Sequence, residues 1–156
     1  MAGYKGHLRG GFIAAILSIL IVAPYLPLRR TPLNIFLLIT SILLGSLLPD
    51  IDHPNSILGR YIPFISKPLN KHIGHRSLTH SIFFILSLVL AISLIGFKVF
   101  AFGLGVGMLS HLLLDLFWPG SHGVAFLYPF YKRRIDLTPN LSFTKKRRHY
   151  KRKRRY

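Results

Sequence analysis

The chain has 156 residues, the length of one small domain, and its 21 lysines and arginines against 4 aspartates give a formal net charge of +17. Hydrophobic residues make up 51% of it, which excludes a disordered protein, and charged residues of almost one sign make up 16%, which argues against an ordinary soluble domain. Cysteine is absent, so disulfides and thiolate metal sites are excluded, and any metal must be held by histidine, aspartate or water.

Four apolar stretches follow one another along the chain, at about residues 12–28, 33–48, 81–97 and 101–118. Helices of this length are about 24–27 Å long, slightly short of a hydrocarbon core of about 30 Å. A soluble bundle of buried helices is the alternative, but the third stretch carries no charge on any face. The pattern therefore predicts an all-α, polytopic membrane protein with about four transmembrane helices in a small bundle.

The basic residues predict the orientation of these helices. If the N-terminus, the 50–80 loop and the chain from residue 132 onward share one side, that side carries 18 of the 21 lysines and arginines. By the positive-inside rule, both termini are then cytoplasmic. A cleaved signal peptide is the alternative for the first stretch, but that stretch continues through Pro24 and Pro27 without a clear cleavage site.

Two regions follow from this organisation: a helical transmembrane, metal-binding domain over residues 1–140 and a basic, disordered cytoplasmic tail over residues 141–156. The tail ends in KKRRHYKRKRRY, in which nine of twelve residues are basic. The preceding segment, 119–140, is rich in turn formers and aromatic residues, and we expect it to return along the inner membrane surface.

Two pairs of small residues mark expected helix contacts. Gly103 and Gly107 are four apart, as are Ser41 and Gly45. Such pairs allow helices to approach closely in lipid, although glycine is also simply common in membrane helices.

The histidines and aspartates that precede the tail fall mostly into four clusters. They are His7 alone; Asp50, Asp52 and His53 in LLPDIDHP; His75, Arg76 and His80 in GHRSLTHS; and His111 and Asp115 in SHLLLD. His7 is expected just before the first helix, the second cluster after the second helix, the third before the third helix, and the fourth in the cytoplasmic half of the last helix. All four clusters therefore reach the same membrane face.

Each cluster also has a simpler interpretation. His111 and Asp115 share a helix face, and an aspartate in a span costs about 2.5–3.5 kcal/mol unless it is paired or coordinated, so the pair is either a hydrogen-bonded contact or part of a metal site. The Asp-x-Asp-His motif either bridges cations or caps a helix end. Thr79 is a candidate N-cap for the third helix, which would place His80 at its first position.

As a group, these residues are numerous enough for two or more divalent cations. Histidine nitrogen and carboxylate oxygen suit both Zn²⁺ and Mn²⁺ as ligands. We expect Zn²⁺ and keep Mn²⁺ as the alternative. In a two-metal site the ions activate water and clamp both oxygens of a displacement, which suits phosphoester hydrolysis.

The motifs PDIDHP, GHR-x-x-THS and SH-x-x-x-D, with the early His7 and the later LYPF, resemble those of the YdjM-like family of predicted membrane-bound metal-dependent hydrolases. The resemblance covers about residues 5–135 and implies a small helical protein of the inner (cytoplasmic) membrane with a His/Asp metal site. A more distant similarity to the zinc-dependent phospholipase C superfamily suggests a phosphoester substrate. After the last motif the chain departs from the family pattern, with an extra His122 and an unusually basic tail.

Transferred residue by residue, the resemblance implies two sets of site residues. The expected metal ligands are His7, Asp52, His53, His80, His111 and Asp115, of which His53 is either a ligand or an orienting partner. The expected catalytic residues are Asp50 and His75, as ligand or general acid/base, and Arg76, which would hold a phosphate oxygen.

The leading functional hypothesis is therefore a membrane-embedded, metal-dependent hydrolase of phosphoesters, with a lipid or lipid-linked substrate. Its expected partners are membrane lipids, whose anionic headgroups the basic loop and tail would attract. The alternatives are a non-catalytic metal transporter or sensor, and a membrane anchor whose tail binds nucleic acid or anionic lipid. The oligomeric state stays open.

Overall fold

The computed structural model describes residues 3–22, 31–118 and 123–137, and these residues are almost entirely helical. In chain order the elements are α1 (Tyr4–Leu17) with a π-helical extension η1 (Ser18–Val22), α2 (Pro32–Gly45), the 3₁₀ turn η2 (Leu48–Asp52), α3 (Ile57–Tyr61), α4 (Pro63–His72), α5 (Ile82–Leu94) and α6 (Lys98–Phe117). The described residues form no strand, only an isolated β-bridge between Val124 and Ile135. The predicted all-α class is confirmed.

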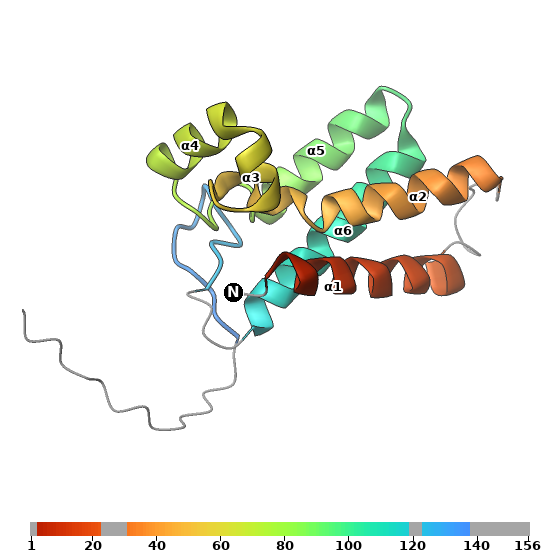
Figure 1. Cartoon of the computed structure of the whole chain (residues 1–156), viewed down its shortest axis with the longest axis horizontal. Helices are drawn as coiled ribbons and strands as arrows, with labels where there is room; N and C mark the ends of the chain where they lie inside the picture. The colour runs from red at the N-terminus through yellow and green to blue at the C-terminus, as the bar shows by residue number, and fades with distance from the viewer. Residues whose placement is uncertain (1–2, 23–30, 119–122, 138–156) are drawn as a thin grey trace, which may run out of the picture.

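Helix α6 is the centre of the bundle, and α1, α2 and α5 all pack against it. Figure 1 shows that the start of α1, the end of α2, the start of α5 and the end of α6 gather at one end of the molecule, beside α3 and α4. We call this the polar end. The loop from α5 to α6, which contains Gly96, lies at the opposite end.

Small residues allow α2 and α6 to cross closely. A Cβ on Gly45 would collide with the backbone of Leu104, and one on Gly107 would collide with the carbonyl of Ile42. At Gly103 it would collide with the Ser41 side chain. The two predicted pairs of small residues are therefore the contact between these helices, a mode of packing typical of membrane bundles.

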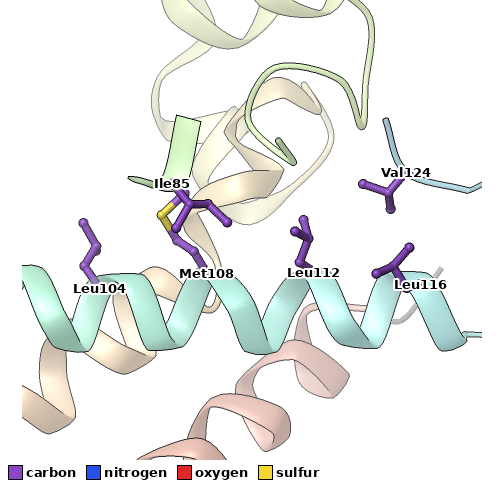
Figure 2. Close-up of a cluster of buried hydrophobic side chains, with 6 residues drawn as sticks. All are labelled: Ile85, Leu104, Met108, Leu112, Leu116 and Val124. Carbon is purple, nitrogen blue, oxygen red and sulfur yellow. The ribbon is translucent and has the colours of Figure 1, made fainter. Parts of the chain in front are cut away.

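The larger apolar cluster lies along one face of α6. Leu104, Met108, Leu112 and Leu116 recur every four residues and pack against Ile85 and Val124, as Figure 2 shows. On the outside of the bundle, large apolar side chains face outward, including Phe12, Leu90 and Leu94, which is 77% exposed. Such an apolar exterior fits a lipid environment.

Two helical segments within the described ranges are long and apolar enough to cross a membrane, Pro32–Asp52 and Lys98–Phe117. Helix α5 is apolar but shorter. The predicted spans at 33–48 and 101–118 therefore meet this criterion of length and composition, and the predicted span at 12–28 lies partly outside the described residues.

Three sequence expectations need correction. Helix α1 begins at Tyr4, so His7 lies inside it and not before it, because a buried stripe of His7, Gly11 and Ala15 begins before the apolar run does. The N-cap of α5 is Ser81, whose hydroxyl accepts from the backbone N–H of Phe83 at 3.1 Å. Thr79 and His80 therefore lie in the preceding loop, and the Thr79 hydroxyl donates to the Asp52 carboxylate and does not cap the helix.

The connections at the polar end are more ordered than expected. The loop expected over residues 50–80 contains η2, α3 and α4. The segment 123–137 folds back against it: the Ala125 N–H donates to the Arg76 carbonyl at 3.0 Å, and the Ile82 N–H donates to the Phe126 carbonyl at 3.0 Å. The expected tail over 141–156 and His122 lie outside the described residues.

The α2–α6 contact predicts a difference between two neighbouring glycines. Gly107→Ala should lower the thermal midpoint of the detergent-solubilised protein by the equivalent of about 1–3 kcal/mol, because its Cβ meets backbone atoms that cannot move aside. Gly105→Ala is the matched control, since its Cβ meets only a Val89 methyl group, and it should cost less. Equal midpoints for the two variants would contradict the close crossing.

Candidate metal centre

The fold brings the four polar clusters of the sequence together at the polar end. Helix α1 supplies His7, η2 supplies Asp50 and Asp52, the α4–α5 loop supplies His75, Arg76 and His80, and α6 supplies His111 and Asp115. Most of these side chains are fully buried, with His80, His111 and Asp115 all at 0% exposure. These side chains therefore form a buried cluster and not a solvated cluster on the surface.

Four ligand-type atoms form its inner shell: His80 Nε2, His111 Nε2, Asp50 Oδ1 and Asp115 Oδ2. The two imidazole nitrogens are 3.2 Å apart. His80 Nε2 lies 3.9 Å from Asp50 Oδ1 and 3.5 Å from Asp115 Oδ2, and His111 Nε2 lies 3.7 Å from each of the same oxygens. Ligands about 2.0–2.2 Å from a tetrahedral Zn²⁺ are about 3.3–3.6 Å from one another. The distances from the two nitrogens, 3.2–3.9 Å, are close to this spacing, so a four-coordinate divalent cation fits among the donors after small movements.

The two carboxylate oxygens of this shell lack ordinary partners. Neither Asp50 Oδ1 nor Asp115 Oδ2 has a hydrogen-bond partner within the described part of the chain, although both atoms are buried. Leaving a buried charged acceptor unsatisfied costs at least about 1–3 kcal/mol. A cation between these oxygens would remove that cost, which is the strongest local sign of a metal site.

The histidines are oriented so that their Nε2 lone pairs face inward. His111 Nδ1 lies 2.8 Å from the Ser46 carbonyl, which only accepts, so Nδ1 carries the proton. His80 Nδ1 is 3.0 Å from the Thr79 hydroxyl, which is itself 2.6 Å from Asp52 Oδ2. A hydroxyl that donates to Asp52 accepts from His80, which leaves His80 Nε2 available as a ligand.

Asp52 orients the residues of the centre through hydrogen bonds. Its Oδ1 lies 2.6 Å from His75 Nδ1, and its Oδ2 accepts from the Arg76 backbone N–H at 3.0 Å and from Thr79. The sequence prediction makes Asp52 a direct ligand, whereas here both of its oxygens are engaged in hydrogen bonds. His75 Nε2, in contrast, is buried and has no hydrogen-bond partner among the described residues. A carboxylate that holds the far nitrogen of a histidine is the usual support of a histidine ligand.

Donors extend beyond the inner shell on both sides. His7, His111 and Asp115 form one potential ligand group, and Asp50, His75 and His80 form another, each with ligand atoms within 4.8 Å of one another. The His7 ring stacks on the His111 ring at a centroid distance of 3.7 Å. The arrangement therefore has donors for a second cation beside the first.

Arg76 lies inside the cluster and not at its surface. Its guanidinium donates to Asp115 Oδ1 at 2.8 Å, which leaves Asp115 Oδ2 for the inner shell. The residue is 3% exposed and has a φ of 63°, in the left-handed region that residues other than glycine rarely adopt. This conformation places the backbone N–H on Asp52 and the side chain on Asp115, so Arg76 is built into the centre.

His53 lies at the edge of the centre. Its Nδ1 accepts the Asn55 backbone N–H at 3.1 Å, and its ring makes an edge contact with His75 at 4.8 Å between centroids. It belongs to neither ligand group within the described ranges. The geometry therefore favours the orienting alternative of the sequence analysis over direct ligation.

The electrostatics favour a bound cation. Three aspartates and one arginine give the centre a formal charge of −2 with neutral histidines, which equals the charge that one divalent cation would balance. Burial lowers the pKa of His80, but the neighbouring Asp115 and Asp52 carboxylates raise it to about 9. The centre thus stabilises positive charge, whether a proton or a metal ion.

Two contributors were not identified from the sequence. Thr79 belongs to the GHRSLTHS motif, and its position next to His80 is a signal that a capping interpretation obscured. Ser46 contributes a backbone carbonyl, which no residue pattern indicates.

The inner shell predicts which histidines the metal needs. Purified protein reconstituted with Zn²⁺ should retain at least one equivalent, and His80→Ala or His111→Ala should lose it, because each removes an inner nitrogen. His72→Ala is the matched control, since His72 is exposed on α4 and outside both ligand groups. Elemental mass spectrometry after gel filtration measures this, and equal metal in all four proteins would contradict the site.

Asp52→Asn separates a supporting carboxylate from a ligand. As a supporting residue, Asp52 should contribute about 10–100-fold to metal affinity while its loss leaves the amount bound at saturation unchanged. A competition titration against a chelator gives both quantities. Loss of an equivalent of metal at saturation would instead show that Asp52 is a direct ligand, as the sequence analysis expected.

Comparison with known proteins agrees with the membrane character and the motifs. The profile of the family described as YdjM inner membrane protein matches residues 2–149. The chain is 40% identical to the Inner membrane protein YdjM of Escherichia coli (strain K12) over 98 residues, which are 59% of this chain and 49% of that protein. It is 42% identical to the Uncharacterized protein YvsG of Bacillus subtilis (strain 168) over 86 residues, which are 54% of this chain and 52% of that protein.

The chain thus spans about half the length of the curated relatives that it matches. No solved structure matches it significantly. Because the profile covers nearly the whole sequence, including all the residues of the metal centre, the chain belongs to the YdjM inner membrane protein family.

Proposed function

We propose that this membrane protein is a metal-dependent hydrolase of phosphoesters. The observation that carries the proposal is the inner shell of two histidine nitrogens and two buried carboxylate oxygens without hydrogen-bond partners. A divalent cation held there, Zn²⁺ ahead of Mn²⁺, would have to accept water or a phosphoester oxygen as a further ligand, and it would then polarise that oxygen or lower the pKa of that water. Nitrogen and oxygen donors of this kind are typical of hydrolytic zinc sites.

The contacts of each residue indicate which role it would have in the centre. Asp50, His80, His111 and Asp115 would hold the first cation. His7, grouped with His111 and Asp115, and His75, grouped with Asp50 and His80, are the further donors for a second cation.

His75 is also the best-placed general acid/base. It is 19% exposed, its Nδ1 is held by Asp52 at 2.6 Å, and its Nε2 has no hydrogen-bond partner among the described residues. A histidine fixed in this way can exchange a proton at Nε2 while the carboxylate stabilises the imidazolium.

We further propose that α1, α2, α5 and α6 all cross the membrane, with the polar end at the cytoplasmic face. The described basic residues support this orientation. Lys98 begins α6, and this end of α6 is opposite the polar end. The others are in the first turns of α1, in the 50–80 segment and in the 123–137 segment: Lys5, Arg9, Arg60, Lys67, Lys71, Arg76, Lys132, Arg133 and Arg134. A centre at this depth lies near lipid headgroups, so a lipid or lipid-linked phosphoester is the favoured substrate. Exposed Lys67 and Lys71 on α4 would attract anionic headgroups.

The position of the centre favours hydrolysis over transport. A transporter places its ligands near the middle of the membrane, at the interface of its repeats. Here the ligands lie at one end of the bundle, and Asp50 and His75 are the partly exposed members. In the described fold, Asp50 and His75 therefore give the centre access at the polar end of the bundle.

Hydrolysis is tested with a panel of phosphomonoesters, phosphodiesters and phospholipids in detergent. The metal-loaded wild type should release product, His111→Ala should lose at least 100-fold, and His72→Ala should keep wild-type activity. A truncation after Asn140 should also stay active, because every residue assigned to the centre precedes Asn140 in the chain. Full metal occupancy without turnover of any substrate in the panel would contradict the hydrolase and favour a non-catalytic metal protein.

The orientation is tested by labelling, since the chain has no cysteine of its own. Lys71→Cys and Lys98→Cys each introduce one thiol, at the polar end and at the opposite end of the bundle. In intact cells, a membrane-impermeant maleimide should label Lys98→Cys and leave Lys71→Cys unlabelled until the cells are opened. The reverse pattern would invert the proposed topology.

A further inference from the structure

A cavity of about 300 Å³ opens directly beside the metal centre. The polar residues around it come from three segments: Tyr4 at the start of α1, Asp50 in η2, and His53, Asn55, Ser56 and Arg60 in the following turn and α3. This volume is at the small end of the range for ligand pockets, about 300–1,000 Å³. It suits a compact polar group and not a long chain.

Asp50 connects the cavity to the centre. Its Oδ1 belongs to the inner shell, at 3.7 Å from His111 Nε2, and the same residue lines the cavity. The Asp50 side chain is 14% exposed, whereas those of His80, His111 and Asp115 are at 1% or less. A molecule in this cavity therefore contacts Asp50, the residue that also carries one of the inner-shell oxygens.

The other polar groups around the cavity are mainly hydrogen-bond donors. His53 Nδ1 accepts the Asn55 N–H, so the neutral ring carries its proton on Nε2. Arg60 adds a permanent positive charge on an exposed side chain, and the Tyr4 hydroxyl and the Asn55 amide add further donors. The Ser56 hydroxyl is already engaged, because it donates to the Asp50 carbonyl at 2.7 Å.

The charges set a condition on what binds. Asp50 is the acidic residue around the cavity, and by itself it would repel an anion. A divalent cation in the inner shell cancels that charge and leaves Arg60 and the other donors to act. Anion binding in this cavity should therefore depend on the metal.

We propose that this cavity binds the phosphoryl group of the substrate, with the Arg60 guanidinium on its non-bridging oxygens, and that it does so only when the centre holds its cation. The inference rests on the proposed function and names the phosphate-recognising residue of the same site. A phosphate with a short alcohol group fills the available volume, so the chemistry is that of a small phosphoester, either soluble or the headgroup of a lipid.

The test uses inorganic phosphate as the probe and isothermal titration calorimetry on the detergent-solubilised full chain. Wild type loaded with Mn²⁺ should bind phosphate, and metal-free wild type should not. Arg60→Gln should weaken binding at least about 10-fold, because it removes a charged hydrogen bond, while its metal content stays at the wild-type level. Arg133→Gln is the matched control, an exposed arginine that does not line the cavity, and should bind phosphate like the wild type.

The outcomes separate the two proposals. Metal uptake with equal phosphate affinity in wild type and Arg60→Gln, or equal affinity with and without metal, would overturn the role of the cavity and leave the hydrolase proposal standing. Failure of the wild type to take up metal would overturn both.

Competition then identifies the source of the phosphoryl group. Displacement of phosphate by glycerol 3-phosphate supports the proposal with a soluble substrate, and displacement by phosphatidic acid micelles supports it with a lipid. Displacement by neither would overturn the assignment to a phosphoester.

Discussion

The structure depends on burying carboxylates at one end of an apolar helical bundle. Asp52 and Asp115 are almost fully buried, and Asp50 is mostly so. A buried ion without a partner costs several kcal/mol, so each of these charges needs compensation. Hydrogen bonds compensate the charge of Asp52. In Asp115, the Arg76 guanidinium compensates one of the two carboxylate oxygens, Oδ1. The oxygens left over, Asp50 Oδ1 and Asp115 Oδ2, face two imidazole nitrogens, which is the arrangement that a divalent cation would stabilise.

The rest of the fold keeps these donors at fixed separations. Glycines at the α2–α6 crossing bring the Ser46 carbonyl, at the end of α2, within 2.8 Å of His111 on α6. His7 comes from α1 and stacks on the same ring. Because the donors come from α1, η2, the α4–α5 loop and α6, the centre also holds the ends of the bundle together. Metal binding and the stability of the polar end should therefore be coupled.

The convergence of the clusters could be predicted from the sequence, because the order of apolar stretches places alternate helix ends on the same side. The small-residue pairs that set the α2–α6 crossing could also be predicted. Which residues are ligands and which orient the ligands could not be predicted from the sequence. Whether Asp52 ligates or supports depends on which groups reach its two oxygens, and the left-handed conformation of Arg76 settles part of that. The start of α1 and the cap of α5 were misplaced for a related reason, since hydropathy does not record which hydroxyl or imidazole finds a buried partner.

Zinc K-edge X-ray absorption of the reconstituted full chain tests the central claim most directly, because it reports the atoms bound to the metal without requiring a substrate. The inner shell predicts four-coordinate zinc with nitrogen and oxygen neighbours at about 2.0–2.2 Å and outer-shell scattering from at least two imidazole rings. Those imidazole features should be reduced in His111→Ala and unchanged in His72→Ala. A spectrum of oxygen neighbours alone, identical in the wild type and both variants, would contradict a metal centre built from His80 and His111.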